Sequence, residues 1–108
     1  MIYYHITKGQ YLPSILKFGL IPGFKTGFCV MKPDQRRTAY PMAVFLTDNV
    51  KYIFDTQLTE GWVKRSRAIV LAVDCTDLHV TQRYGPETHE YLYYTTISYA
   101  RIISNKAL

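Results

Sequence analysis

Residues 2–7 have the sequence Ile2-Tyr3-Tyr4-His5-Ile6-Thr7. Branched and aromatic side chains surround a single imidazole, and this composition predicts a short strand at the start of the chain. A polar side chain in an apolar run is costly unless it has a partner or a task. His5 is therefore the first candidate functional residue.

A second stretch of the same kind lies near the other end, at His89-Glu90-Tyr91-Leu92-Tyr93-Tyr94. It predicts another strand, and here Glu90 is the polar residue that needs an explanation. The residues that follow the link Thr95-Thr96 predict a closing strand over 97–103. The two ends of the chain thus each offer one chemically capable side chain on a strand.

The elements between these segments follow from local patterns. Apolar positions at helical spacing predict a helix over 9–18, and Gly19 is placed to end it in a left-handed cap. We expect strands at 43–46, 68–73 and 79–83, a helix at 49–56, turns at 74–78 and 84–87, and a long surface loop at 23–41 that carries binding function or closes over a site. The order predicts one α+β domain spanning 1–108, with a small, bent or split, mainly antiparallel sheet and two or three short helices.

The charge balance bears on partners. The chain has 13 Lys and Arg against 8 Asp and Glu, a formal net charge of +5. Such a surplus favours contact with nucleic acid or with phosphate-bearing ligands. Arg36 and Arg37 form one small basic cluster within the predicted loop, and residues 64–67 contain another. Solvated loop charge is the alternative interpretation of both clusters.

Other sequence features predict the setting in which the chain works. Cys29 and Cys75 lack the spacing of a disulfide framework or a zinc site, and we expect Cys75 to be a small core residue. There is no apolar run long enough to cross a membrane and no signal-peptide pattern at the start. We therefore expect a reduced, cytoplasmic setting, no membrane and no bound metal.

Three segments, in order, give the chain a family resemblance. They are Tyr4-His5-Ile6-Thr7 followed by a helix ending in Gly19-Leu20, then Val44-Phe45-Leu46-Thr47-Asp48-Asn49, and finally His89-Glu90-Tyr91-Leu92-Tyr93-Tyr94. Together they resemble the His-Tyr-Glu type of the ADP-ribosyltransferase superfamily. The opening is similar to DNA-targeting ADP-ribosyltransferase toxins, and the end is similar to poly(ADP-ribose) polymerase catalytic domains.

The resemblance implies a reaction and a role for each residue. NAD would be the co-substrate, and its nicotinamide–ribose bond would break through an oxocarbenium-like state. Glu90 would be the catalytic acid near the ribose, and His5 would bond the adenosine-side ribose. The backbone of Ile6 would meet the nicotinamide amide, and Thr7 would contact a ribose or phosphate. Phe45 would stack on nicotinamide, with Tyr52 as a second wall.

The resemblance indicates the chemical class of the acceptor less directly. A mono-ADP-ribosyltransferase is expected, with DNA or RNA favoured over protein because of the basic balance and the loop that carries Arg36 and Arg37. Glu87 could orient the acceptor, or it could be a plain loop charge. An antitoxin or immunity protein is a further possible partner, since the toxins are the nearest resemblance.

Two alternatives stay open. One is a catalytically degenerate domain of the same fold that binds NAD, a nucleotide or a partner protein, which Phe45 and Ile6 favour because the family usually has Tyr and Gly there. The other is an RNA 2′-phosphotransferase-like enzyme of the same superfamily, which shares the opening segment but does not keep the acid at the position of Glu90.

Overall fold

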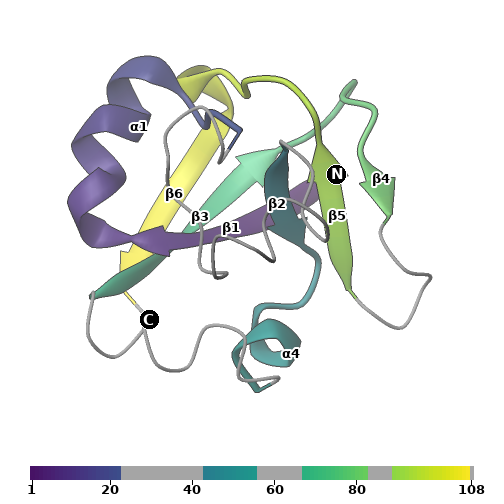
Figure 1. Ribbon diagram of the computed structural model, residues 1–108, viewed down its shortest axis with the longest axis horizontal. Helices are drawn as coiled ribbons and strands as arrows, with labels where there is room; N and C mark the ends of the chain where they lie inside the picture. Colours follow the sequence, from purple (N-terminus) through teal and green to yellow (C-terminus); the bar gives the residue numbers. More distant parts are fainter. Residues whose placement is uncertain (23–42, 56–66, 83–88, 108) are drawn as a thin grey trace, which may run out of the picture.

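The structure is a computed structural model in which residues 1–22, 43–55, 67–82 and 89–107 are described. Their strands form one six-stranded antiparallel sheet in the order β4-β5-β2-β1-β3-β6 (Figure 1). The strands are β1 (Ile2–Lys8), β2 (Val44–Thr47), β3 (Ala68–Asp74), β4 (Thr81–Gln82), β5 (Glu90–Tyr93) and β6 (Ile102–Ala107). The helices are η1 (Gly9–Tyr11), α1 (Leu12–Phe18), α4 (Val50–Asp55) and η3 (Tyr99–Arg101).

The α+β class and the mainly antiparallel sheet are thus confirmed. The predicted strands at 2–6, 43–46 and 68–73 and the predicted helix at 49–56 all exist, within two residues of their expected bounds. The expected helix at 9–18 divides into a 3₁₀ turn and α1, with Pro13 in the first turn of α1. The loop predicted at 23–41 and the turn predicted at 84–87 lie outside the described residues.

One predicted strand was wrong. Residues 97–103 do not form a single strand, since Ile97 makes an isolated bridge to Leu20, η3 follows, and β6 begins only at Ile102. The side chain of Ser98 accepts a hydrogen bond from the Ala100 N–H at 3.2 Å, which stabilises the 3₁₀ turn in place of extended chain. Residues 104–107 of β6 were not predicted as strand because Ser104, Asn105 and Lys106 give no apolar pattern.

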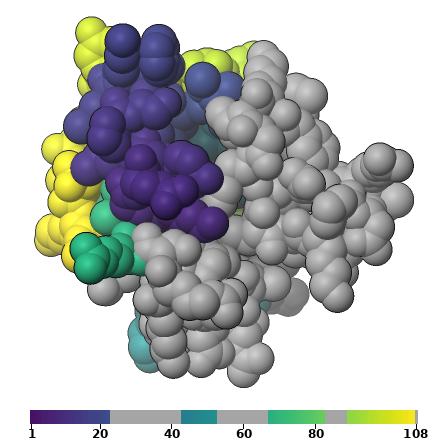
Figure 2. Space-filling view, turned by 60° about the vertical axis from the view of Figure 1, so that its left-hand side comes forward, coloured from purple at the N-terminus to yellow at the C-terminus, as the bar shows by residue number. Residues whose placement is uncertain are grey.

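The core lies between α1 and one face of the sheet. Leu71 and Val73 of β3 have no exposed surface, and they belong to a cluster that also includes Ile15 of α1 and the bridged pair Leu20 and Ile97. Cys75 is a buried free thiol in the same cluster, as predicted. Figure 2 shows the first residues (purple) and the last residues (yellow) meeting along one side of the molecule.

Gly19 allows the chain to turn from α1 into this bridge. Its φ is +84°, and its N–H donates to the Ile15 carbonyl at 2.8 Å, which closes the helix. A Cβ at this position would overlap the Ile97 carbonyl oxygen. Glycine is therefore required both by backbone conformation and by the close approach of the next segment.

Candidate functional site

The two halves of the sheet meet at a narrow junction. All seven residues of β1 pair with β3, whereas the pairing described between β1 and β2 is confined to Tyr4 and Thr47. Figure 1 shows the reason, because β1 runs across β2 at a steep angle and the two strands diverge. We refer to this place, where Tyr4 meets Thr47 and the strands separate, as the β1–β2 seam.

His5 lies at the β1–β2 seam. Its Nδ1 is 2.7 Å from the carbonyl oxygen of Phe45 on β2. A carbonyl can only accept, so Nδ1 carries the proton in this bond, and in the neutral ring Nε2 is left as an acceptor. Burial lowers the pKa of His5, and the bond to Phe45 opposes that effect only in part. His5 is therefore a neutral imidazole near pH 7, suited to accept a hydrogen bond from a hydroxyl group.

Glu90 reaches the same level of the sheet from the other side of β2. Thr47 pairs with Tyr4 on one side and with Glu90 on the other, so these three residues form a row across β1, β2 and β5. Residues directly opposite each other share a face of a sheet, and successive residues alternate. Glu90 thus shares a face with Tyr4, while His5 leaves β1 on the alternate face and reaches Phe45 where the strands separate.

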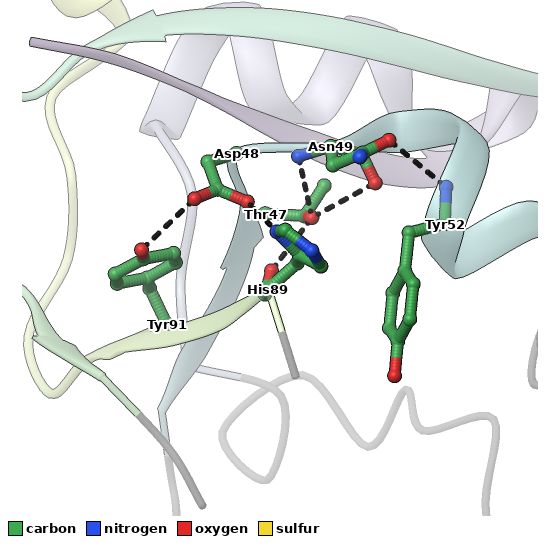
Figure 3. Close-up of polar contacts among 6 residues, drawn as sticks. All are labelled: Thr47, Asp48, Asn49, Tyr52, His89 and Tyr91. Atoms are coloured by element: carbon green, nitrogen blue, oxygen red, sulfur yellow. Dashed lines mark hydrogen bonds and ion pairs between the residues drawn. The ribbon is translucent and has the colours of Figure 1, made fainter. Parts of the chain in front are cut away.

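A buried hydroxyl fixes the start of β5 to the end of β2. The side chain of Thr47 is almost fully buried, and its Oγ1 lies 2.7 Å from the His89 carbonyl oxygen and 3.2 Å from that of Asn49. A hydroxyl has one proton, so it donates to the nearer oxygen, that of His89. The same Oγ1 accepts from the Asn49 N–H at 3.0 Å (Figure 3).

Asn49 continues this network into α4. Its Oδ1 accepts a hydrogen bond from the Tyr52 N–H at 3.0 Å, the geometry of a helix N-cap. Asn49 therefore caps the first turn of α4. As a result, β2, the start of β5 and the first turn of α4 form one hydrogen-bonded corner.

A carboxylate and an imidazole face each other at this corner. Asp48 Oδ1 lies 2.7 Å from His89 Nδ1, and Asp48 Oδ2 accepts from the Tyr91 hydroxyl at 2.9 Å (Figure 3). Burial, and then the bond to Asp48, raise the pKa of Tyr91, so its phenol stays protonated as a donor. The ring of Tyr52 is tilted against that of His89, with centroids 4.8 Å apart.

Sequence reasoning had missed this cluster. His89 and Asp48 appear in the sequence analysis only as members of the segments that carry the family resemblance, with no role of their own. The residues joined here lie 41 and 43 positions apart in the chain. Only the register between β2 and β5 brings them together, and no spacing within either segment reveals that register.

The predicted NAD-binding residues occupy different environments. Ile6 is half-buried and pairs with Val70 of β3, and Phe45 is half-buried and pairs with Leu92 of β5. Tyr52 is exposed at the start of α4. Thr7 has only 2% of its surface exposed, so a contact between its hydroxyl and a ligand would require this part of the core to open.

The residues expected to bind the acceptor cannot be placed. Arg36, Arg37 and Glu87 lie outside the described residues.

Among the residues that the structure describes, no group of three or more His, Cys, Asp or Glu side chains could hold a metal ion. No helix in the described part of the chain is long and apolar enough to cross a membrane.

Comparison with known proteins adds no family assignment. No protein-family model matches the chain, and no curated protein sequence matches it.

Proposed function

We propose that the chain is an NAD-dependent mono-ADP-ribosyltransferase with an ADP-ribosyltransferase-like fold. It cleaves the nicotinamide–ribose bond of NAD and transfers ADP-ribose to a macromolecular acceptor, with nucleic acid favoured over protein. The resemblance of three segments, which contain His5, Phe45 and Glu90, motivates the proposal. The formal charge of +5 supports a polyanionic acceptor.

One observation carries the proposal furthest. His5 and Glu90 come from opposite ends of the sequence, yet they lie on the two strands that flank β2, at the level of the Tyr4–Thr47–Glu90 row. His5 lies at the β1–β2 seam, and Glu90 lies across β2 from it, on the other face of the sheet.

The chemistry assigned to each group follows from its state. As the C1′–N bond breaks, nicotinamide leaves as a neutral base with the bonding electrons, and positive charge develops on the ribose. The carboxylate of Glu90 stabilises that charge and accepts a hydrogen bond from the 2′-hydroxyl. Neutral His5 accepts a hydrogen bond from the adenosine-side ribose through Nε2, while Nδ1 remains held by Phe45.

Nicotinamide release from NAD tests this proposal. We expect Glu90→Gln, which keeps shape and removes charge, to lower the rate by about 10²–10³-fold, the range seen when one electrostatic stabiliser is removed. NAD affinity, measured by calorimetry, should stay within a few-fold. The matched control is Asp77→Asn, the same kind of change at an exposed turn after β3. Full activity in Glu90→Gln would refute the assigned role.

The same measurements separate the alternative functions. A degenerate binding domain, favoured by Phe45 at the stacking position, would bind NAD but release no nicotinamide with any acceptor added. A 2′-phosphotransferase-like enzyme would need an RNA 2′-phosphate and would tolerate Glu90→Gln. If the protein neither binds NAD nor releases nicotinamide, the resemblance has no functional meaning.

A further inference from the structure

We propose that His89, oriented by Asp48, is the base that removes the proton from the acceptor during ADP-ribose transfer. This inference rests on the proposed function, since it assigns a residue to the second half of the same reaction. Its basis is the cluster of Asp48, His89 and Tyr91 at the start of β5 (Figure 3).

The hydrogen bond to Asp48 locates one proton of the His89 ring. An ionised carboxylate can only accept, so the 2.7 Å contact with Asp48 Oδ1 places the proton on His89 Nδ1. The neutral ring then carries its lone pair on Nε2, the nitrogen that can take a proton from another molecule. The Tyr91 hydroxyl holds the second carboxylate oxygen at 2.9 Å, so both oxygens of Asp48 are oriented.

The cluster is accessible to a macromolecule. The side chains of His89 and Asp48 are 33% and 29% exposed. Tyr52, whose ring lies beside that of His89, is also exposed. A base for a large acceptor has to be reachable from the surface in this way.

The backbone at His89 is in an uncommon conformation. Its φ is +53°, a region that non-glycine residues adopt rarely and at a cost of about 1–2 kcal/mol. The hydroxyl of Thr47 holds the His89 carbonyl in this arrangement at 2.7 Å. Strained residues of this kind are concentrated at functional sites.

The position of His89 also suits the reaction. It directly precedes Glu90, and consecutive Cα atoms are about 3.8 Å apart. His89 and Glu90 thus belong to one short segment, in which Glu90 lies on the face of β5 opposite to Tyr91. In this step the acceptor X–H forms a bond from X to C1′, the C1′–N bond breaks, and His89 Nε2 takes the proton. The products are ADP-ribosyl-X and nicotinamide, and His89 then returns its proton to water.

The test separates acceptor modification from NAD cleavage. The variants are His89→Gly, because glycine tolerates the positive φ, and Asp48→Asn, which removes the orienting charge. The control is Asp77→Gly, a second residue with positive φ (+69°), after β3 and separated from β5 by β1 and β2 in the sheet. Radiolabelled NAD is supplied with mixed-sequence single-stranded DNA, single-stranded RNA or lysate protein, and label transfer and nicotinamide release are both measured.

We expect transfer by His89→Gly to fall about 10²-fold or more, the usual range for a general base, and to fall at least about tenfold more than nicotinamide release. Added imidazole should restore part of the transfer, which a purely structural role cannot explain. Asp48→Asn should change the ratio of transfer to release in the same direction by a smaller factor. Asp77→Gly should match the wild type.

Several results would overturn the inference. Unchanged transfer in His89→Gly would do so, as would a parallel loss of transfer and release that imidazole does not rescue. If the wild type releases nicotinamide but modifies none of the three acceptors, water is the acceptor; NAD cleavage then stands, and the transfer step assigned to His89 is overturned. If no Glu90-dependent release occurs at all, the proposed function fails and the inference fails with it.

Discussion

Replacing Thr47 by valine removes one hydroxyl while keeping the shape of the side chain. That hydroxyl is buried, donates to the His89 carbonyl at 2.7 Å and accepts from the Asn49 N–H at 3.0 Å. Valine offers neither a donor nor an acceptor. The variant therefore leaves two backbone groups without this partner at the corner that joins β2, β5 and α4.

The size of the effect follows from these contacts. A buried polar group left unsatisfied costs about 1–3 kcal/mol, and the lower end applies because both bonds are only partly buried. The added methyl group returns up to about 0.8 kcal/mol. The expected loss in the free energy of unfolding is thus about 1–2 kcal/mol. With a urea dependence of about 1 kcal/mol per molar, the unfolding midpoint falls by about 1–2 M.

Urea unfolding followed by circular dichroism measures this loss. Nicotinamide release, measured at urea concentrations below the unfolding transition, shows how Thr47→Val affects the site. We expect release to fall as well, because the hydroxyl holds the residue that precedes Glu90. Thr47→Ser keeps the hydroxyl and should retain the geometry, while Thr81→Val on an exposed edge strand controls for the substitution itself. If Thr47→Val unfolds at the wild-type midpoint, or if Thr47→Ser loses as much as valine does, the reasoning is refuted.

Three further predictions concern the rest of the described chain. Gly19→Ala should lower stability by about 3 kcal/mol, since it combines the strain of a positive φ with disruption of two hydrogen bonds between Leu20 and Ile97; urea unfolding checks it. Burial lowers the pKa of His5, so the unfolded chain takes up a proton near pH 6.5 before the folded one does; stability should decline as the pH falls below about 6.5, and His5→Gln should flatten that decline between about pH 7 and 5. Burial raises the pKa of the Cys75 thiol, so iodoacetamide should label it slowly in native protein and rapidly in urea, as read by peptide mass spectrometry.

Local pattern was sufficient for most of the elements. Continuous apolar runs, such as residues 68–73, and helical spacing in α1 identify structure without any knowledge of partners. The closing strand was misjudged because Ile97 is apolar for a different reason: it is buried against Leu20 as an isolated bridge. Local pattern cannot distinguish that contact from membership of a strand.

The site was predictable only in part. His5 and Glu90 could be singled out because each is polar within an apolar strand, and that signal is local. Asp48 and His89 sit at strand ends, where polar residues are ordinary, so nothing marks them until the register pairs their strands. The positive φ of His89 is likewise set by tertiary contacts, since a histidine by itself does not predict it.

The central position of β1 has a consequence for the order of folding. β1 precedes the other described strands in the sequence, yet both of its neighbours come much later: His5 bonds Phe45 across 40 positions, and the amino group of Met1 bonds Thr76 across 75. Such distant pairings close slowly, because the entropy of large loops must be lost before the contacts form. The β1–β2 seam forms only after β2 has joined, and Glu90 is added later still with β5. A nascent chain therefore acquires its proposed chemistry only after β5 has been synthesised and has joined the sheet.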